Sequence, residues 1–278
     1  MFSFSLLSGI SFAKIDKNTG EILAKHAKKQ ALPEELKILL SLLDLTSLEG
    51  SDNAASINKL CDKACSFKEK ALPLPAAVCI YPPFIHTAKK HLIGTGIHVA
   101  TTAAAFPSGQ MPVRVKLEEI KYAMAEGADE IDIVISRGTF LEGNYNTVYR
   151  EIDTIRELTR GLTLKVILET GELGSYENIA KASEIAIEAG ADFIKTSTGK
   201  ISPAATEQAV YVMLQVILSH YKKTGKSVGI KPAGGIAEIG KAMNYYYLVS
   251  EVLGEDWLQP RLFRLGASRL ADRILELF

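Results

Sequence analysis

The stretch Asp192-Phe-Ile-Lys-Thr-Ser-Thr-Gly-Lys200 decides the fold of this chain. Its first part is rich in β-branched and aromatic residues, which is typical of a buried strand, yet Lys195 stands inside that run. A helix-like segment ends before it at Gly190, and a second amphipathic segment starts after it near Pro203. This order of helix, strand and helix predicts a parallel α/β fold, in which ligands meet the chain at the carboxyl ends of the strands.

The same strand-then-helix unit can be counted eight times along the chain. The expected strands cover residues 39–45, 76–81, 98–106, 131–135, 164–169, 193–198, 227–233 and 262–266. The expected helices cover 53–67, a segment with His86 and His91, 115–126, 144–159, 176–189, 204–221, 236–253 and 268–278. Eight such units predict a closed (β/α)8 barrel of the TIM type as a single α/β domain. An open, doubly wound sheet is the alternative.

The first 37 residues precede these repeats. Residues 20–32 are expected to be helical and Pro33 to start another helical turn, so the chain divides into an N-terminal helical extension, 1–37, and a barrel domain, 38–278. The start, Met1 to Ala13, is apolar but lacks the basic region and the cleavage site of a signal peptide. We expect it to be a solvent-side or oligomer-contact extension.

Composition narrows the range of partners and compartments. The 278 residues include 32 basic and 32 acidic ones, and this balance argues against nucleic acid or an anionic membrane as the main partner. No apolar stretch approaches the roughly 18 residues of a membrane span. The cysteines Cys61, Cys65 and Cys79 form no paired framework, which favours a reducing, cytoplasmic location. Cys61 and Cys65 share a helix face but have no further ligands at metal spacing, so neither a metal nor another cofactor is expected.

Charged residues alternate with apolar ones in the central strands. In residues 131–135 the isoleucines suit the helix-facing side, which turns Asp132 toward the barrel interior. The same alternation turns Lys165, Lys195 and Lys231 inward from the next three strands. One acid and three lysines therefore point into the barrel from four consecutive strands. In the first strand, Asp44 shares its parity with Thr46 near the carboxyl end.

Three inward ammonium groups against two carboxylates leave at least one lysine under-compensated. Burial beside like charge lowers the pKa of a lysine and increases the fraction of neutral amine at pH 7. A neutral amine in a dry pocket adds to a carbonyl and forms an imine, so the pattern predicts Schiff-base chemistry with Asp132 as the available acid or base. A buried ion network that serves only packing is the alternative interpretation.

Glycines follow the last three expected strands. They occur in Gly199-Lys200, Gly234-Gly235 and Gly266-Ala-Ser268. Glycine lets backbone N–H groups approach an anion, and these loops form a phosphate pocket in many barrels. Any one pair alone is equally explained as a turn, but together they predict a phosphorylated substrate. Lys200 either adds a positive charge to this pocket or is an ordinary solvated lysine.

Six segments together resemble the deoxyribose-phosphate aldolases. They are LDLT at 43–46, GADEIDIV at 127–134, LKVILETGEL at 164–173, DFIKTSTGK at 192–200, GIKPAGGI at 229–236 and LGAS at 265–268. The resemblance implies a class I aldolase, a cofactor-free lyase that reversibly cleaves 2-deoxy-D-ribose 5-phosphate into D-glyceraldehyde 3-phosphate and acetaldehyde. It also allows a homodimer.

The resemblance implies roles for individual residues as well. Lys195 would form the imine, Lys231 would lie beside it and perturb its pKa, and Asp132 would relay protons. The expected aldehyde contacts are Asp44, Thr46 and Lys165, and the other expected substrate contacts are Thr196, Gly199, Lys200, Gly234, Gly235, Gly266 and Ser268.

The chain departs from the family pattern at three places. Arg269 stands where some members have serine, and Ala237 stands where some have a basic side chain. The chain ends in Glu-Leu-Phe278, whereas some members end in a mobile tail with a terminal tyrosine that is thought to help proton transfer. Two other functions stay open on sequence grounds. One is a class I aldolase or transaldolase for another phosphosugar, and the other is a non-catalytic barrel that binds sugar phosphate.

Overall fold

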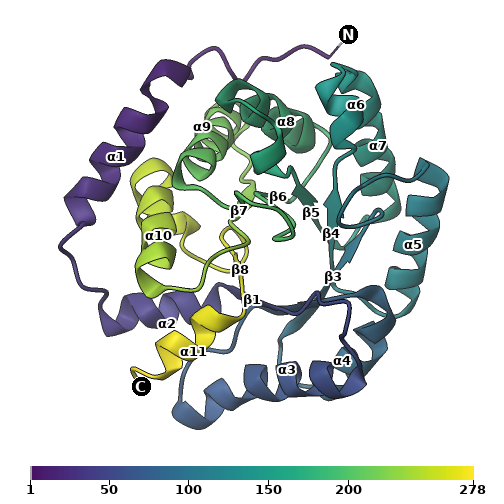
Figure 1. The fold of residues 1–278 in the computed structure, drawn as a ribbon, viewed down its shortest axis with the longest axis vertical. Coiled ribbons are helices and arrows are strands. Elements are labelled where there is room, and N and C mark those ends of the chain that lie inside the picture. The colour runs from purple at the N-terminus through teal and green to yellow at the C-terminus, as the bar shows by residue number, and fades with distance from the viewer. Residues whose placement is uncertain (1) are drawn as a thin grey trace.

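The computed structural model describes residues 2–278, which form a ring of eight parallel strands surrounded by helices (Figure 1). The strand order is β7-β6-β5-β4-β3-β2-β1-β8. Parallel bridges between Ile230 and Phe263 and between Ala233 and Gly266 join the two ends of this order. The expected closed (β/α)8 barrel is therefore confirmed, and the open, doubly wound alternative is wrong.

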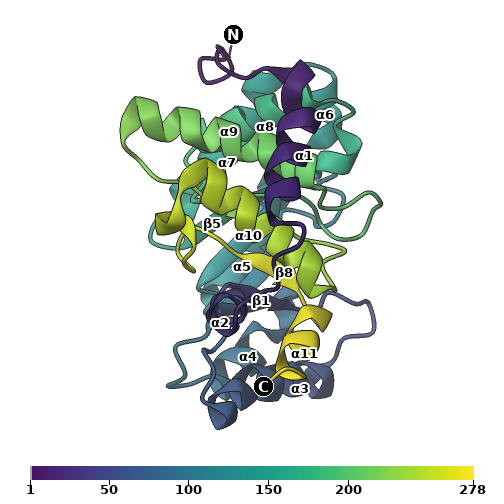
Figure 2. The same cartoon turned by 90° about the vertical axis from the view of Figure 1, so that its left-hand side faces the viewer.

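The elements follow the expected alternation. The strands are Leu43–Thr46 (β1), Ala77–Ile80 (β2), His98–Ala103 (β3), Glu130–Val134 (β4), Thr163–Ile167 (β5), Phe193–Lys195 (β6), Gly229–Lys231 (β7) and Leu265–Ala267 (β8). The helices are Ile15–His26 (α1), Pro33–Ser41 (α2), Ala54–Ser66 (α3), Ile85–His91 (α4), Val113–Ala125 (α5), Arg137–Leu141 (α6), Tyr145–Leu158 (α7), Tyr176–Glu188 (α8), Glu207–Thr224 (α9), Ile239–Leu253 (α10) and Arg269–Leu275 (α11). Helix α1 lies outside the ring, against α9 and α10 (Figures 1 and 2).

The first strand starts later in the structure than the sequence predicts. Residues 39–41 belong to α2, and β1 starts only at Leu43. Pro33 occupies the first turn of α2, and the Glu35 side chain accepts the Leu32 N–H, so this helix has a strong start signal. Leu36, Leu39 and Leu40 then recur at helical spacing and are all buried. Continuous leucine runs suit a buried helix as well as a strand, which explains the error.

The N-terminal segment differs from its expectation in two ways. Helix α1 covers 15–26 rather than 20–32, and Gly20 lies on its exposed side. The apolar start is not a solvent-side extension, because it packs on its own barrel. Phe4 meets Tyr145 of α7 edge to face at 5.3 Å, and Leu6 is 2% exposed. The backbone N–H of Leu6 donates to the Glu184 carboxylate of α8 at 3.0 Å.

The ladders are shorter than the apolar runs that predicted them. β3 ends at Ala103 rather than at 106, and β6 ends at Lys195 rather than at 198. β8 begins at Leu265, although Phe263 already bridges to β7. The short helix α6 was not expected, since its five residues are too few to show a helical period.

The barrel separates an apolar layer from a charged interior. The outward residues of the strands, such as Ile131, Ile133 and Val166, join one large cluster with the buried faces of the helices. The inner side of β2 and β3, together with Leu48 in the loop after β1, carries a small second apolar cluster around Cys79. The remaining interior of the barrel holds buried ionisable side chains, among them Asp132, Lys165 and Lys231. Within residues 2–278 we find no helix with the length and apolar character that crossing a membrane requires.

Candidate active site

A cavity of about 230 Å³ opens at the carboxyl ends of the strands. Its walls come from the loops after β1, β6, β7 and β8, where a barrel of this type places its ligands. Eight of the expected site residues line it, namely Thr46, Lys195, Gly199, Lys200, Gly234, Gly235, Gly266 and Ser268. Thr46, one of the three expected aldehyde contacts, and six of the seven other expected substrate contacts therefore line one cavity together with Lys195.

Asp132 of β4 connects three buried lysines below this cavity. Its Oδ1 accepts a hydrogen bond from Lys165 Nζ at 2.8 Å. Its Oδ2 accepts from Lys195 Nζ at 2.8 Å and from Lys231 Nζ at 2.7 Å. The inward orientation that the strand parity predicted is thus confirmed for all four side chains. They meet because β4, β5, β6 and β7 are consecutive neighbours in the ring.

Asp44 of β1 pairs with Lys231 on the other side of the same interior. Lys165 does not line the cavity, because its ammonium is held between Asp132 and the Glu130 carboxylate, the latter at 2.5 Å. Asp44 and Lys165 are fully buried, so the structure places both below the cavity rather than on its wall.

The environments of Lys195 and Lys231 differ in the number of carboxylates that each one contacts. Burial and the nearby Lys231 ammonium lower the pKa of Lys195, and the single carboxylate of Asp132 does not offset them. Burial also opposes the charge of Lys231, but Asp132 and Asp44 outweigh it and raise the pKa of Lys231 above its ordinary value. Lys195 is therefore the interior lysine with the greater tendency to be neutral, and it also reaches the cavity.

The pKa of Asp132 is held well below its usual range. Burial alone would raise it, but the ammonium groups of Lys165, Lys195 and Lys231 outweigh burial. Asp132 is thus a carboxylate that stays ionised and contacts the amine that would react. A carboxylate in that position can accept a proton from, or return one to, a group bound at Lys195.

Glycines shape the loops around the cavity. Gly199, Gly234 and Gly235 have φ values of +78°, +86° and +71°, a region in which side chains other than glycine are strained. A Cβ atom on Gly234 would also lie 2.7 Å from the Cβ of Ala204. These loops therefore bring the backbone closer to the cavity than any other residue would permit.

Two cationic side chains stand at the mouth of the cavity. Lys200 pairs with Glu49 at 3.1 Å across the opening, between the loops after β6 and β1. Arg269 lines the cavity at the start of α11 and is exposed. Among the described residues the guanidinium of Arg269 has no salt bridge or hydrogen bond, which leaves it available for an anion.

The residues after Lys195 anchor the loop. The Thr196 hydroxyl donates to the carbonyl of Ala233 at 3.2 Å and accepts from the N–H of the same residue at 3.0 Å. Thr196 is fully buried and does not line the cavity, so the structure ties it to the segment after β7 rather than placing it on the wall. The N–H of Thr198 donates to Glu169 at 3.0 Å, which fixes the turn before Gly199.

Sequence reasoning missed several residues of this region. Glu130 and Arg264 are buried members of the interior ion network, and Glu49, Thr198 and Arg269 line the cavity. Parity offered a signal for the first two, because Glu130 shares its phase with Asp132 and Arg264 shares its phase with Gly266. Arg269 stood out only as a departure from the family pattern. Glu49 and Thr198 are in irregular loops, where no period indicates the direction of a side chain.

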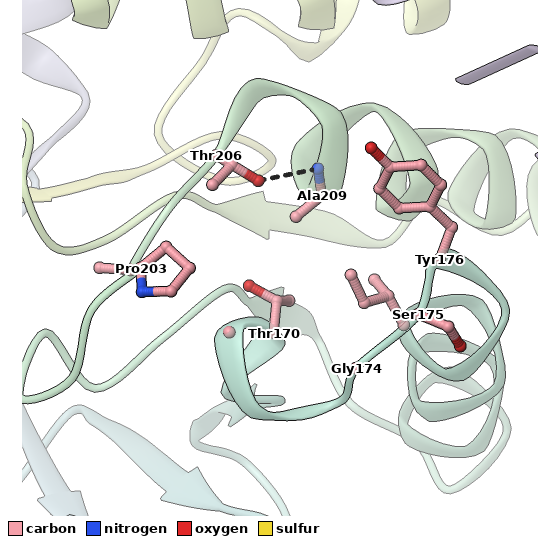
Figure 3. Close-up of a pocket in the computed structure, with 10 residues that line it drawn as sticks. Thr170, Gly174, Ser175, Tyr176, Pro203, Thr206 and Ala209 are labelled. Atoms are coloured by element: carbon pink, nitrogen blue, oxygen red, sulfur yellow. Dashed lines mark hydrogen bonds between the residues drawn. The ribbon is translucent and has the colours of Figure 1, made fainter. Parts of the chain in front are cut away.

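A second cavity of about 450 Å³ lies outside the barrel ring, where α8 and α9 begin (Figure 3). Thr206 and Ser175 cap these two helices, and Tyr176 and Pro203 form part of the wall. The side chain of Thr170 points into the middle of this group (Figure 3). No lysine lines the cavity, so it offers no amine for imine chemistry. A search of residues 2–278 for three or more histidine, cysteine or acidic side chains in a metal-binding arrangement found no such group.

Comparisons with known proteins agree on one family. Residues 38–244 match the model of the DeoC/LacD family aldolases. The chain is 45% identical over 262 residues to the deoxyribose-phosphate aldolase of Homo sapiens, covering 90% of this chain and 82% of that protein. It is 44% identical over 282 residues to the enzyme of the same name from Bos taurus, covering 95% and 89%.

The structure resembles that of the tetrameric deoxyribose phosphate aldolase from Aeropyrum pernix, with a TM-score of 0.69 and 25% identity over 92% of this chain and 96% of that one. Both the sequence and the fold therefore place the ion network and the cavity in an aldolase scaffold. The chain belongs to the DeoC/LacD family of aldolases.

Proposed function

We propose that this protein reversibly cleaves 2-deoxy-D-ribose 5-phosphate into D-glyceraldehyde 3-phosphate and acetaldehyde through an imine on Lys195. The observation that carries this proposal is the position of the Lys195 amine. It lies on the cavity wall, is compensated by one shared carboxylate and has a lowered pKa. The names of the human and bovine relatives support the choice of substrate.

The reaction follows from the chemistry of a neutral amine. Lys195 adds to the aldehyde carbon C1 of the open-chain sugar, and loss of water gives a protonated imine. Removal of the proton from the C3 hydroxyl then breaks the C2–C3 bond, and its electron pair passes into the imine to form an enamine. D-Glyceraldehyde 3-phosphate leaves, C2 of the enamine is protonated, and water releases acetaldehyde and the free amine.

Asp132 carries the protons in this proposal, and the Lys231 ammonium sets the charge beside it. Asp132 contacts Lys195 directly, so a proton can pass between Asp132 and a group bound at Lys195. Lys231 keeps its charge and repels a second charge on Lys195. The three groups titrate as one unit, so the apparent pKa values of the reaction belong to the set rather than to one residue.

The loops after β6, β7 and β8 suit the phosphate end of the substrate. Gly199, Gly234 and Gly235 expose backbone to the cavity, and Lys200 and Arg269 add positive charge at its mouth. In this proposal the phosphate displaces Glu49 from Lys200. Phosphate oxygens are strong acceptors for backbone N–H groups and cationic side chains.

Borohydride trapping tests the mechanism directly. The protein is incubated with acetaldehyde and sodium borohydride, digested and analysed by peptide mass spectrometry. We expect a two-carbon reduced adduct on Lys195 and none in a Lys195→Leu variant, which should keep its fold but lose turnover. A folded wild-type protein without this adduct would contradict the proposal and leave a phosphate-binding barrel with structural lysines.

Substrate competition tests the choice of sugar. We expect faster cleavage of 2-deoxy-D-ribose 5-phosphate than of fructose 1,6-bisphosphate. The reverse order would indicate a class I aldolase or transaldolase for another phosphosugar.

The state of assembly and the location in the cell stay predictions. We propose a homodimer; the apolar N-terminal segment packs on α7 and α8 of its own barrel. Light scattering after gel filtration would distinguish a dimer from a tetramer like that of the Aeropyrum pernix aldolase. A cytoplasmic location and a division of the chain after residue 37 are also proposals, and that boundary falls inside α2.

A further inference from the structure

Arg264 lies at the opposite end of the barrel interior from the active-site cavity. It precedes β8 in the segment that closes the ring, and its backbone N–H donates to the carbonyl of Ile230 at 3.0 Å. A cavity of about 520 Å³ at the amino ends of the strands is lined by Arg264 together with Glu130 and His98. Arg264 does not line the active-site cavity, so it acts on Lys195 only through other groups.

The guanidinium of Arg264 is fixed by contacts on all of its nitrogen atoms. Nη1 donates to Asp44 Oδ1 at 2.6 Å, and Nη2 donates to Glu130 Oε1 at 2.8 Å. Nε donates to the carbonyl of Pro260, and the planar group lies 5.7 Å from the ring centre of Phe193. The Arg264 side chain is 6% exposed, and both carboxylates are fully buried. A charge held in this way has a fixed position as well as a fixed sign.

Arg264 decides the charge balance of the interior. With it, four cations (Lys165, Lys195, Lys231 and Arg264) face three carboxylates (Asp44, Glu130 and Asp132), and each belongs to one continuous set of ion pairs. The excess is one positive charge. Without Arg264 three cations would face three carboxylates, and every lysine could keep its proton in a neutral interior.

We propose that Arg264 is a positioning residue that keeps the interior of the barrel one positive charge in excess and thereby makes Lys195 the lysine that gives up its proton. This inference rests on the proposed imine chemistry of Lys195. Arg264 engages one oxygen of Asp44 and both oxygens of Glu130, so those carboxylates cannot fully compensate the lysines. Lys165 and Lys231 still contact two or more carboxylates each, whereas Lys195 contacts one.

The other ionisable groups around Lys195 do not restore the balance. The groups in or beside the network are Asp44 from β1, Cys79 from β2, His98 from β3, Glu130 and Asp132 from β4, Lys165 from β5, Lys231 from β7 and Arg264 before β8. Burial raises the pKa of the Cys79 thiol, which therefore stays neutral. The hydrogen bond to Glu130 at 2.8 Å raises the pKa of His98, whose half-exposed ring lies at the far end of the barrel, so protonation of His98 adds to the positive excess and does not cancel it.

The pH dependence of imine formation tests the inference. The rate of borohydride trapping on Lys195 is measured with acetaldehyde from about pH 5 to about pH 10, which covers the pKa of a lysine lowered by burial. Arg264→Met should move the midpoint of this profile upward by about one pH unit, because the loss of one unit charge from a connected buried network changes a pKa by about that much at an effective dielectric constant of about 20. Arg264→Lys keeps the charge and should leave the midpoint near that of the wild type.

A double variant separates charge balance from structural damage. Arg264→Met with Glu130→Gln leaves three cations against two carboxylates, which restores the excess of one, so its midpoint should return to within about 0.3 unit of the wild type. Because residue 130 is neutral in this double variant, the loss of Arg264 does not leave the Glu130 carboxylate buried without its cation. If Arg264→Met alone does not fold, Arg264→Gln carries the same expectation, since its amide can still donate to a carboxylate.

The outcomes are distinguishable from those that test the imine itself. An upward shift of the midpoint in Arg264→Met, and its reversal in the double variant, would support the inference. An unchanged midpoint in a folded Arg264→Met or Arg264→Gln protein, or an equal shift in the single and double variants, would overturn it. A wild-type protein that forms no adduct on Lys195 would instead contradict the proposed function on which the inference rests.

Discussion

Lys195 and Lys231 are the same kind of side chain on neighbouring strands, yet their surroundings change their pKa values in opposite directions. Lys231 is held between two carboxylates, whereas Lys195 shares one of them. Burial favours the neutral form of both, so the number of carboxylates decides the sign of the shift. The difference between a nucleophile and a permanent cation is therefore a difference of one contact.

Replacing Lys231 should strongly reduce activity without removing the nucleophile. In Lys231→Met the like charge beside Lys195 is lost, so Lys195 should hold its proton more tightly, and Asp132 should lose the hydrogen bond from Lys231. We expect kcat/KM to fall by about 10²- to 10⁴-fold. Steady-state cleavage of 2-deoxy-D-ribose 5-phosphate measures this loss, with circular dichroism to check the fold. Activity within a few-fold of the wild type would remove Lys231 from the mechanism.

Arg269 should act on the phosphate end of the substrate. Its guanidinium lines the cavity and has no described partner, so Arg269→Met should remove a charge-assisted hydrogen bond worth about 1.5–3 kcal/mol. The KM for 2-deoxy-D-ribose 5-phosphate should then rise by about 10- to 100-fold, with little change in kcat. Cleavage of unphosphorylated 2-deoxyribose should not change.

Arg160 offers a matched control for this experiment. Its side chain is 73% exposed and pairs with Glu157 of the same region, away from the cavity. Arg160→Met should leave both KM values unchanged. Equal effects of Arg269→Met on the phosphorylated and unphosphorylated sugars would show that Arg269 does not bind the phosphate.

Among the elements, the N-terminal segment is the one whose position the sequence did not indicate. Phe4 and Leu6 are apolar residues in a short irregular stretch, and nothing local specifies which surface they cover. In the structure they lie on α7 and α8, and Glu184 accepts the backbone N–H groups of Ser5 and Leu6. Glu184 is almost 180 residues away in sequence, so only the finished barrel provides this partner.

Truncating Leu6 should reveal how much this contact stabilises the barrel. Leu6 is 2% exposed, so Leu6→Ala should lower the free energy of unfolding by about 2–5 kcal/mol, the range for a buried leucine. Ile93 is 79% exposed, and Ile93→Ala should change the free energy of unfolding by less than about 0.5 kcal/mol. Urea unfolding of both variants gives the comparison. Equal stabilities would show that the segment is not packed on the barrel in solution.

At the scale of the whole molecule, the interior ion network makes stability depend on pH. The pKa values of Asp44, Glu130 and Asp132 are all lowered in the fold, because the surrounding cations outweigh the burial that would raise them. Carboxylates of this kind contribute stability that is fully present above the unfolded pKa of about 4. That contribution is lost as the pH falls below about 4 toward the folded pKa values.

The free energy of unfolding should therefore be nearly constant from about pH 7 to pH 5 and fall steeply below about pH 4. Urea titrations at a series of pH values would measure it. A free energy that did not change between pH 5 and pH 3 would mean that the carboxylates have ordinary pKa values in the fold.

Several features of the fold and the site are local and could be predicted. Alternation along β4 to β7 decides which residues face inward, since successive side chains of a strand point to opposite sides. That rule placed Asp132 and the three lysines correctly. The rule does not apply where apolar runs are continuous. Residues 39–41 were expected in the first strand but belong to α2, because Pro33 and Glu35 start a helix there.

The sequence by itself determined the eight repeated units, the inward parity of the lysines and the glycine loops, because these depend on periods and residue types along a short stretch of chain. Only the tertiary structure decided that Arg264 and Glu130 complete the ion network, that Lys195 has the fewest carboxylate partners and that the apolar start covers α7 and α8. The reason is that charge balance and burial depend on residues from distant strands, and these residues come together only when the barrel closes.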